Sequence, residues 1–196
     1  MKGILKKLTV FVTIAAITIF VAAATASAGD HDRKTIRGVY GWAGPGNCIP
    51  TDVDGLPLPN ADRFFMTGQG TITFKHDGTG KVRFTGFGGN NAGAFSYEAL
   101  YDHEYYIAPE GAITIDSVRD TYVQKFLTGP IAGFHLYIDF LRLKGWISAD
   151  HMTITIATPE PSVNINTYPE LGFQSYSICN FSYTLVRVGG REEDIE

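Results

Sequence analysis

Apolar and polar residues alternate with a period of two along most of the chain, and this pattern constrains the fold more than any other feature. Ile72 and Phe74 alternate with polar residues, and Val82 and Phe84 repeat the pattern after the segment HDGTG at residues 76–80. Alternation places every second side chain on one face of a strand, and Asp-Gly favours a tight turn. The sequence therefore predicts an antiparallel hairpin here.

Further alternating runs indicate strands over residues 95–101, 113–116, 152–158 and 178–188. The run over residues 134–148 changes the parity of its apolar positions between Phe140 and Leu141, which predicts either a β-bulge or a break into two strands. The segment at residues 148–151 then predicts a second hairpin turn. The expected fold class is all-β, an antiparallel β-barrel of about eight to ten strands, with a two-sheet β-sandwich as the alternative.

The amino-terminal segment has the three parts of a secretory signal peptide. Lysines at positions 2, 6 and 7 precede an apolar run over residues 8–24, and Ala-Ser-Ala follows at residues 26–28. An uncleaved membrane anchor is the alternative, but the run is short and no basic cluster follows it. We expect residues 1–28 to be a signal peptide cleaved between Ala28 and Gly29, which implies a periplasmic or extracellular bacterial protein without a membrane anchor.

The rest of the chain reads as one domain. We expect a single β-barrel domain over residues 29–188 and a flexible acidic tail over residues 189–196. Removal of residues 1–28 takes away three lysines and no acidic residue, so the formal net charge of −4 becomes more negative. An acidic protein lacks the basic surface that neutralises phosphates, so nucleic acid is not an expected partner.

Cys48 and Cys179 are the two cysteines of the chain. An oxidising compartment favours their pairing, and neither has a neighbouring His or basic residue that would activate a thiolate. Cys48 follows the first expected strand, residues 35–43, and Cys179 begins the last. A disulfide between them would join the two edges that a barrel must bring together.

Two stretches resemble a group of exported bacterial β-barrel proteins of similar length, which have one disulfide and no assigned function. The first is RGVYGWAGPGNC at residues 37–48, and the second is KGWISADHMTITIA at residues 144–157, with Ile178 and Cys179 after it. The resemblance covers most of the chain beyond the signal peptide. It implies export and a paired Cys48 and Cys179, and it brings no catalytic residues.

A weaker resemblance is to the lipocalin-like (calycin) barrels, whose first strand carries a Gly-x-Trp motif. Here Trp42 directly follows Gly41, and the residue two after Gly38 is Tyr40, so the motif is not met. The resemblance implies a small apolar ligand, although a fold does not by itself fix a function.

Aromatic side chains are the candidate ligand-binding residues. They can line a cavity, with tyrosine hydroxyls as polar anchors, or they can fill the interior of a small barrel. The candidates for ligand contact are Tyr40, Trp42, Tyr97, Tyr101, Tyr137, Phe140 and Trp146.

Motifs for catalysis, metals and cofactors are not recognisable in the sequence. The histidines are scattered without zinc-site spacing, so no metal site is expected. The glycine-rich segment at residues 86–93 lacks the Lys-Ser/Thr of a phosphate loop and is interpreted as a flexible loop, and no cofactor is expected.

Three functions remain open at this stage. The preferred one is an exported, non-catalytic binding protein for a small apolar or aromatic ligand. The first alternative is a structural or interaction module, a filled barrel whose loops at residues 44–62 and 86–94 contact a protein or envelope partner. The second is a small-barrel isomerase or cyclase with His103 or His135 as acid or base, so enzymatic activity is uncertain and disfavoured.

Overall fold

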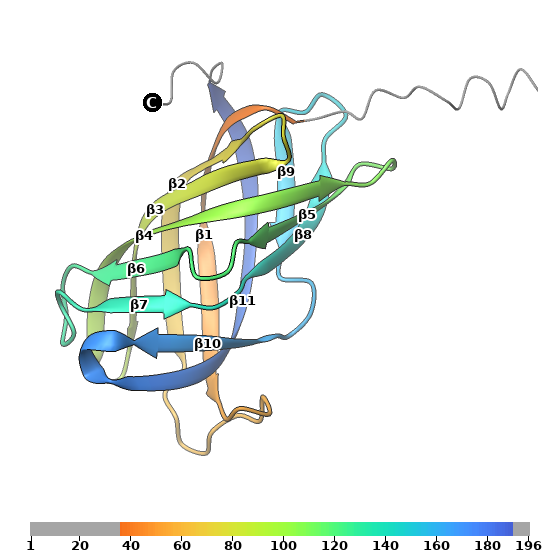
Figure 1. The fold of residues 1–196 in the computed structure, drawn as a ribbon. Coiled ribbons are helices and arrows are strands. Elements are labelled where there is room, and N and C mark those ends of the chain that lie inside the picture. The colour runs from red at the N-terminus through yellow and green to blue at the C-terminus, as the bar shows by residue number, and fades with distance from the viewer. Residues whose placement is uncertain (1–35, 190–196) are drawn as a thin grey trace, which may run out of the picture. The chain divides into compact units, whose positions relative to one another are not determined.

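The computed structural model describes residues 36–189, which form one antiparallel sheet of eleven strands (Figure 1). The elements are β1 (Gly38–Thr51), β2 (Phe64–Phe74), β3 (Thr79–Asn90), β4 (Gly93–Ile107), β5 (Ala112–Ser117), β6 (Tyr122–Phe126), β7 (His135–Ile138), β8 (Arg142–Ile147), β9 (Thr153–Ala157), β10 (Val163–Tyr168), the 3-10 helix η1 (Pro169–Leu171) and β11 (Phe173–Gly189). The expected cleavage site at Ala28 and Gly29 and residues 190–196 of the expected tail lie outside the described residues. Within them, no helix has the length and apolar character needed to cross a membrane.

The sheet closes because the first and last strands pair. β1 pairs with β2 on one side and with β11 on the other, where Cys48 lies opposite Cys179 in the register. The expected meeting of the first and last strands is confirmed. The fold is all-β and antiparallel, and the order β1-β2-β3-β4-β5-β8-β9-β11 makes a closed but uneven ring of eight strands within the eleven-stranded sheet.

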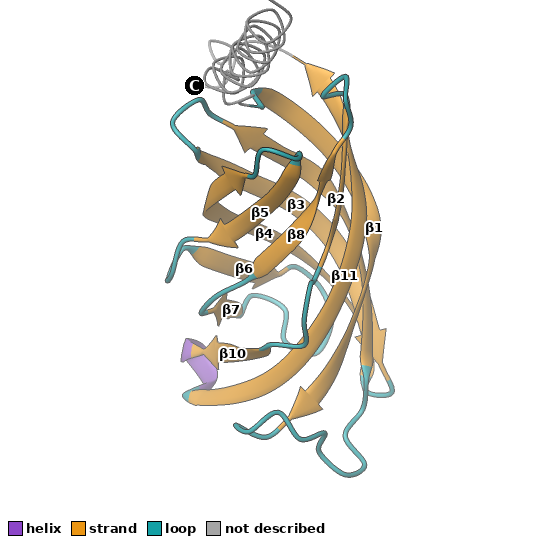
Figure 2. Cartoon of the chain, turned by 90° about the vertical axis from the view of Figure 1, so that its right-hand side faces the viewer, coloured by secondary structure: helices purple, strands orange, loops and turns teal. Residues whose placement is uncertain are grey.

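Two strands, β4 and β11, each pair with two different strands along the same edge, at different heights in the barrel. β4 pairs with β5 through residues 103–107 and with β6 through residues 97–100. β11 pairs with β9 through residues 182–186 and with β10 through residues 173–178. The wall opposite β1 and β2 is therefore divided into an upper tier (β5, β8 and β9) and a lower tier (β6, β7 and β10), which both views show one above the other (Figures 1 and 2).

The two hairpins that the sequence predicts are present. In the β2–β3 hairpin, Ile72 lies opposite Val82, and Gly78 in the turn has a φ of +85°, which glycine adopts without strain. In the β8–β9 hairpin, the Asp150 carboxylate accepts hydrogen bonds from the Ser148 hydroxyl and the Met152 amide. Local turn chemistry therefore sets both connections.

The parity change near Phe140 is a break between strands. β7 ends at Ile138 and β8 begins at Arg142, and the two strands belong to different tiers. The amide of Leu141 donates to the Ser117 hydroxyl, and the amide of Ser117 donates to the Leu141 carbonyl. These two hydrogen bonds connect the tiers where the chain crosses from the lower to the upper one.

Two expectations about glycine-rich segments were wrong. The first strand extends to Thr51 and contains Cys48, and residues 86–90 belong to β3 rather than to a flexible loop. Only part of the expected contact loops at residues 44–62 and 86–94 is therefore loop. Glycine lowers strand propensity, but at inward positions here it leaves room for large neighbouring rings, and tertiary packing overrides the propensity.

The upper half of the barrel, at the level of β5, β8 and β9, has a packed interior that we call the filled half. Its core residues include Ile36, Tyr40, Ile72, Phe74, Val82, His103, Ile113, Ile115, Ile154, Ile156 and Leu185, all at most 2% exposed. The Phe74 ring contacts Tyr40, His103 and Tyr105 edge-on or nearly so, with centroids 5.1 to 5.4 Å away. The Tyr40 hydroxyl donates to the His151 carbonyl at 2.8 Å.

Candidate functional site

The lower half of the barrel, at the level of β6, β7 and β10, encloses a cavity of about 270 Å³, and we call it the hollow half. The strands around it form the lower ring, β1-β2-β3-β4-β6-β7-β10-β11, and each of them contributes to the lining. The aromatic lining residues are Trp42, Phe64, Phe84, Phe95, Tyr97, Tyr101, Tyr122, Phe126, Tyr168, Phe181 and Tyr183. Ala92 and Pro130 also line the cavity and are exposed, so it opens towards the β3–β4 turn and the β6–β7 loop.

Glycines on the inward face make this space possible. Gly44, Gly68 and Gly86 face one another in register across β1, β2 and β3. A Cβ at Gly44 would come within 2.5 Å of the Tyr183 ring, and one at Gly86 would come within 2.6 Å of the Tyr97 hydroxyl. The aromatic rings therefore lie close to the backbone of the neighbouring strands instead of meeting in the middle of the barrel.

Rings pack in an almost continuous layer around the cavity. Trp42 lies between Phe84 and Tyr183, with centroids 5.2 and 4.6 Å away. Tyr101 stacks on Tyr122 at 5.1 Å. Tilted, edge-on and stacked pairs of this kind hold aromatic side chains in fixed orientations. The aromatic rings of the cavity wall thus contact one another as well as the cavity.

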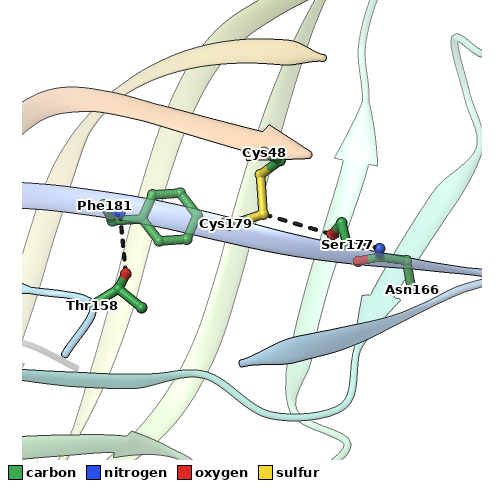
Figure 3. Close-up of a disulfide and its surroundings, with 6 residues drawn as sticks. All are labelled: Cys48, Thr158, Asn166, Ser177, Cys179 and Phe181. Atoms are coloured by element: carbon green, nitrogen blue, oxygen red, sulfur yellow. Dashed lines mark hydrogen bonds between the residues drawn. A yellow bond between two sulfur atoms is a disulfide. The ribbon is translucent and has the colours of Figure 1, made fainter. Parts of the chain in front are cut away.

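Polar groups occur at a few defined places in this wall. Gln124 is buried among the lining residues of β6. On the opposite side, the Asn166 amide donates to the Ser177 hydroxyl at 2.9 Å, and that hydroxyl lies 3.6 Å from the Cys179 sulfur (Figure 3). Among the described residues, no Asp, Glu, Lys, Arg or His lines the cavity. Because an unpaired charge is costly to bury, the cavity favours an uncharged occupant.

The disulfide closes the ring at the level of the cavity. Cys48 and Cys179 are bonded across the β1–β11 pair, with Cα atoms 4.1 Å apart, and both line the cavity (Figure 3). The predicted pairing is confirmed. The bond ties the strands together at the end of the barrel where the interior is open.

The structure brings three of the seven candidate aromatic residues together. Trp42, Tyr97 and Tyr101 line the cavity, whereas Tyr40 lies in the filled half. The other three lie on or near the outer surface: Tyr137 is 37% exposed, Trp146 is 60% exposed, and Phe140 packs under the guanidinium groups of Arg119 and Arg142. These four are not part of the cavity.

Several lining residues were missed at the sequence level, among them Phe84, Phe95, Tyr122, Phe126 and Tyr183. A signal for some of them was present. Phe84 has the inward parity of the first hairpin, and Tyr183 shares the parity of Cys179. The sequence could not show, however, at which height along each strand the interior changes from packed to hollow.

The two histidines considered for catalysis lie away from the cavity lining. His103 is completely buried in the filled half, where its Nε2 lies 3.0 Å from the Thr73 carbonyl oxygen, and desolvation lowers its pKa to about 4. His135 lies at the surface, with its Nδ1 2.6 Å from a carboxylate oxygen of Glu170. Residues 36–189 contain no cluster of three metal-ligating side chains.

A second hollow lies on the outside of the barrel, over β2, β3, β4, β6 and β7. It has a volume of about 620 Å³ and is more polar, and its lining includes Arg83, Glu98, Lys125 and His135. Because it carries charges of both signs, it differs in kind from the interior cavity.

Comparison of the chain with models of known protein families, with curated proteins and with solved structures finds no significant match. The resemblances to exported bacterial barrels and to lipocalin-like barrels therefore rest on the sequence stretches quoted for them. The structure adds an all-β fold with one disulfide.

Proposed function

We propose that this protein is an exported, non-catalytic binding protein for a small, uncharged, apolar or aromatic ligand held in the interior cavity. The observation that carries the proposal is the cavity itself, which lies in a barrel whose other half is closely packed. Protein interiors are normally packed to the density of organic crystals, and an apolar pocket that reaches into an interior is the usual form of a small-molecule site. The signal-peptide pattern and the disulfide support the exported location.

The size of the cavity sets the size of the ligand. An engineered cavity of about 150 Å³ with apolar walls binds benzene. The cavity here is nearly twice as large, at about 270 Å³, so it accommodates a molecule of roughly two fused six-membered rings. Mostly apolar walls with a few polar groups are typical of small-molecule sites.

A second candidate function is interaction with a protein or envelope partner. The outer hollow with Arg83, Glu98 and Lys125 favours it, because mixed charges fit a polar macromolecular surface better than an apolar small molecule. Catalysis by His103 or His135 is the weakest of the three hypotheses, since neither side chain lines the cavity.

Native mass spectrometry of the protein isolated from an exporting bacterial host tests the first proposal. Met66→Trp adds an inward ring that fills the cavity, and Phe65→Trp adds the same ring at the next position, where the side chain is exposed. A small molecule should co-purify with the natural protein and with Phe65→Trp, and it should be missing from Met66→Trp.

A binding titration with α-naphthylamine, a neutral bicyclic fluorophore, complements this experiment. Saturable binding to the natural protein and to Phe65→Trp, with loss of binding in Met66→Trp, is the expected result. The proposal is wrong if no molecule co-purifies and the fluorophore does not bind, or if both variants bind it equally. Either result would favour the interaction module.

A further inference from the structure

Four tyrosines line the cavity, and we call them the tyrosine cluster. Tyr97 and Tyr101 come from β4, Tyr122 from β6 and Tyr183 from β11. In the lower ring, β1-β2-β3-β4-β6-β7-β10-β11, β4 and β11 stand on opposite sides. Tyr101 stacks on Tyr122 with ring centroids 5.1 Å apart, and Tyr97, Tyr101 and Tyr183 lie near enough to Tyr122 to raise its pKa.

The hydroxyls of this tyrosine cluster have no partner in the described part of the protein. No hydrogen bond joins any of the four to another residue of the range 36–189, although all four side chains line the cavity. The filled half differs, because the Tyr40 hydroxyl donates to the His151 carbonyl. The four hydroxyls are not among the buried unpartnered atoms of the described residues, so they are accessible from the cavity and can hydrogen-bond to a molecule in it.

The cluster stays protonated at physiological pH. Burial raises the pKa of Tyr97 to about 12 and raises the pKa values of Tyr101, Tyr122 and Tyr183 as well. Each of these side chains therefore keeps an O–H donor in a cavity whose lining has no charged residue among the described ones. Each phenol oxygen can also accept a hydrogen bond, so the cluster offers four neutral hydroxyl groups to a molecule in the cavity.

We propose that the cavity takes a neutral bicyclic ketone, with its carbonyl oxygen accepting hydrogen bonds from the tyrosine cluster and its rings packed against Trp42 and Phe84. This inference rests on the proposed function and adds the class and orientation of the ligand. A carbonyl oxygen has two lone pairs, so it can accept hydrogen bonds from two of the hydroxyls at once. The apolar part of the molecule then faces Phe64, Met66 and Phe95 towards the mouth.

A matched pair of probes tests this assignment. α-Tetralone is a bicyclic ketone of the required size, and tetralin is the same ring system without the oxygen. The natural protein should bind α-tetralone about tenfold to a hundredfold more tightly than tetralin, because leaving buried donors unpaired disfavours the hydrocarbon. Naphthoate, a charged bicyclic compound, should bind more weakly than either.

Variants identify the groups that are responsible. Tyr101→Phe combined with Tyr122→Phe removes two hydroxyls and should reduce the preference for α-tetralone at least fivefold, while tetralin binds as well as before. Tyr106→Phe is the matched control, since Tyr106 is 67% exposed and lies outside the cavity lining. The infrared C=O stretch of bound α-tetralone should lie at lower frequency in the natural protein and in Tyr106→Phe than in the double variant.

The outcomes separate the two proposals. If tetralin binds as tightly as α-tetralone, the ketone assignment is wrong and the general binding function stands. If the double variant keeps the preference, the hydroxyls of Tyr101 and Tyr122 do not bind the carbonyl, so the assignment to the tyrosine cluster is wrong and the general binding function stands. If neither probe binds and no molecule co-purifies from the host, both the ketone assignment and the binding function are wrong.

Discussion

The filled half and the hollow half of this barrel are built from the same five long strands, yet their interiors differ completely. In the filled half, β-branched and aromatic side chains such as Ile154 and Phe74 meet in the middle of the barrel. In the hollow half, the corresponding inward positions of β1, β2 and β3 include Gly44, Gly68 and Gly86, and rings lie along the walls. The side-chain volume at the inward positions therefore decides whether a given level of the barrel has a packed core or a cavity.

The difference extends to how each half is held together. Packing stabilises the filled half, where the Phe74 ring contacts the rings of Tyr40, His103 and Tyr105. The rings of the hollow half have an empty space on one side, and there a disulfide joins β1 to β11. The Cys48–Cys179 disulfide thus lies beside the cavity, where the interior has the fewest side-chain contacts.

Truncation of a phenylalanine should have the largest effect, and the effect should differ between the halves. Phe74→Ala in the filled half should lower the free energy of unfolding by about 4 kcal/mol, within the usual range for a fully packed ring. Phe126→Ala should cost only about 2 kcal/mol, because that ring borders the cavity and loses fewer contacts. Urea denaturation measures both, and equal losses would contradict the comparison.

Removal of the disulfide should affect mainly the hollow half. Cys48→Ala combined with Cys179→Ala should lower the free energy of unfolding by about 3 kcal/mol. Amide hydrogen exchange should accelerate in the lower tier and in the adjacent part of β11, while β5, β8 and β9 stay protected. A reducing agent should lower the melting temperature of the natural protein and leave that of the variant unchanged; uniform acceleration of exchange would argue against two separate halves.

Acidification should weaken the filled half through His103. Its pKa is about 4 in the folded protein and about 6.5 in an unfolded chain, so the unfolded chain binds more protons between these values. Stability is therefore complete above the unfolded pKa and falls as the pH decreases towards 4, by about 2 kcal/mol between pH 7 and pH 5. Denaturation at several pH values should show this slope, and His103→Gln should remove it.

The smallest expected effect concerns single hydroxyl groups. Tyr40→Phe should cost about 1 kcal/mol, because the hydroxyl of Tyr40 donates to a backbone carbonyl. Tyr101→Phe should change the free energy of unfolding by less than about 0.5 kcal/mol, because its hydroxyl has no partner among the described residues. A loss at Tyr101 as large as that at Tyr40 would show that the hydroxyl is already satisfied in the free protein.

Much of this fold follows from local patterns in the sequence. The alternation of Ile72 and Phe74 with polar residues and the Asp-Gly turn that follows predict the β2–β3 hairpin correctly. The parity change at Phe140 marks the passage from one tier to the other, although the sequence left a bulge and a break equally open. The pairing of Cys48 with Cys179 was expected from export and from barrel closure.

The cavity could be predicted only in part, for a physical reason. The parity of a residue indicates whether its side chain faces the interior. It does not indicate which strand lies across the barrel from that residue, or at what height along the barrel axis the side chain lies. Trp146 is an example: it is aromatic and lies on a strand, but its position points outward, and it is 60% exposed. Tyr122 stacks on Tyr101 only because β4 pairs with β6 as well as with β5, which is a long-range property of the fold.

The forked pairing of β4 and β11 gives the barrel two independent closures. One ring runs through β5, β8 and β9, and the other through β6, β7 and β10, and they share β1, β2, β3, β4 and β11. Either ring alone completes a circuit of eight strands. The lower ring is held between β7 and β10 by only two residue pairs, so loss of this pairing would open the lower ring and leave every strand pairing of the upper ring in place.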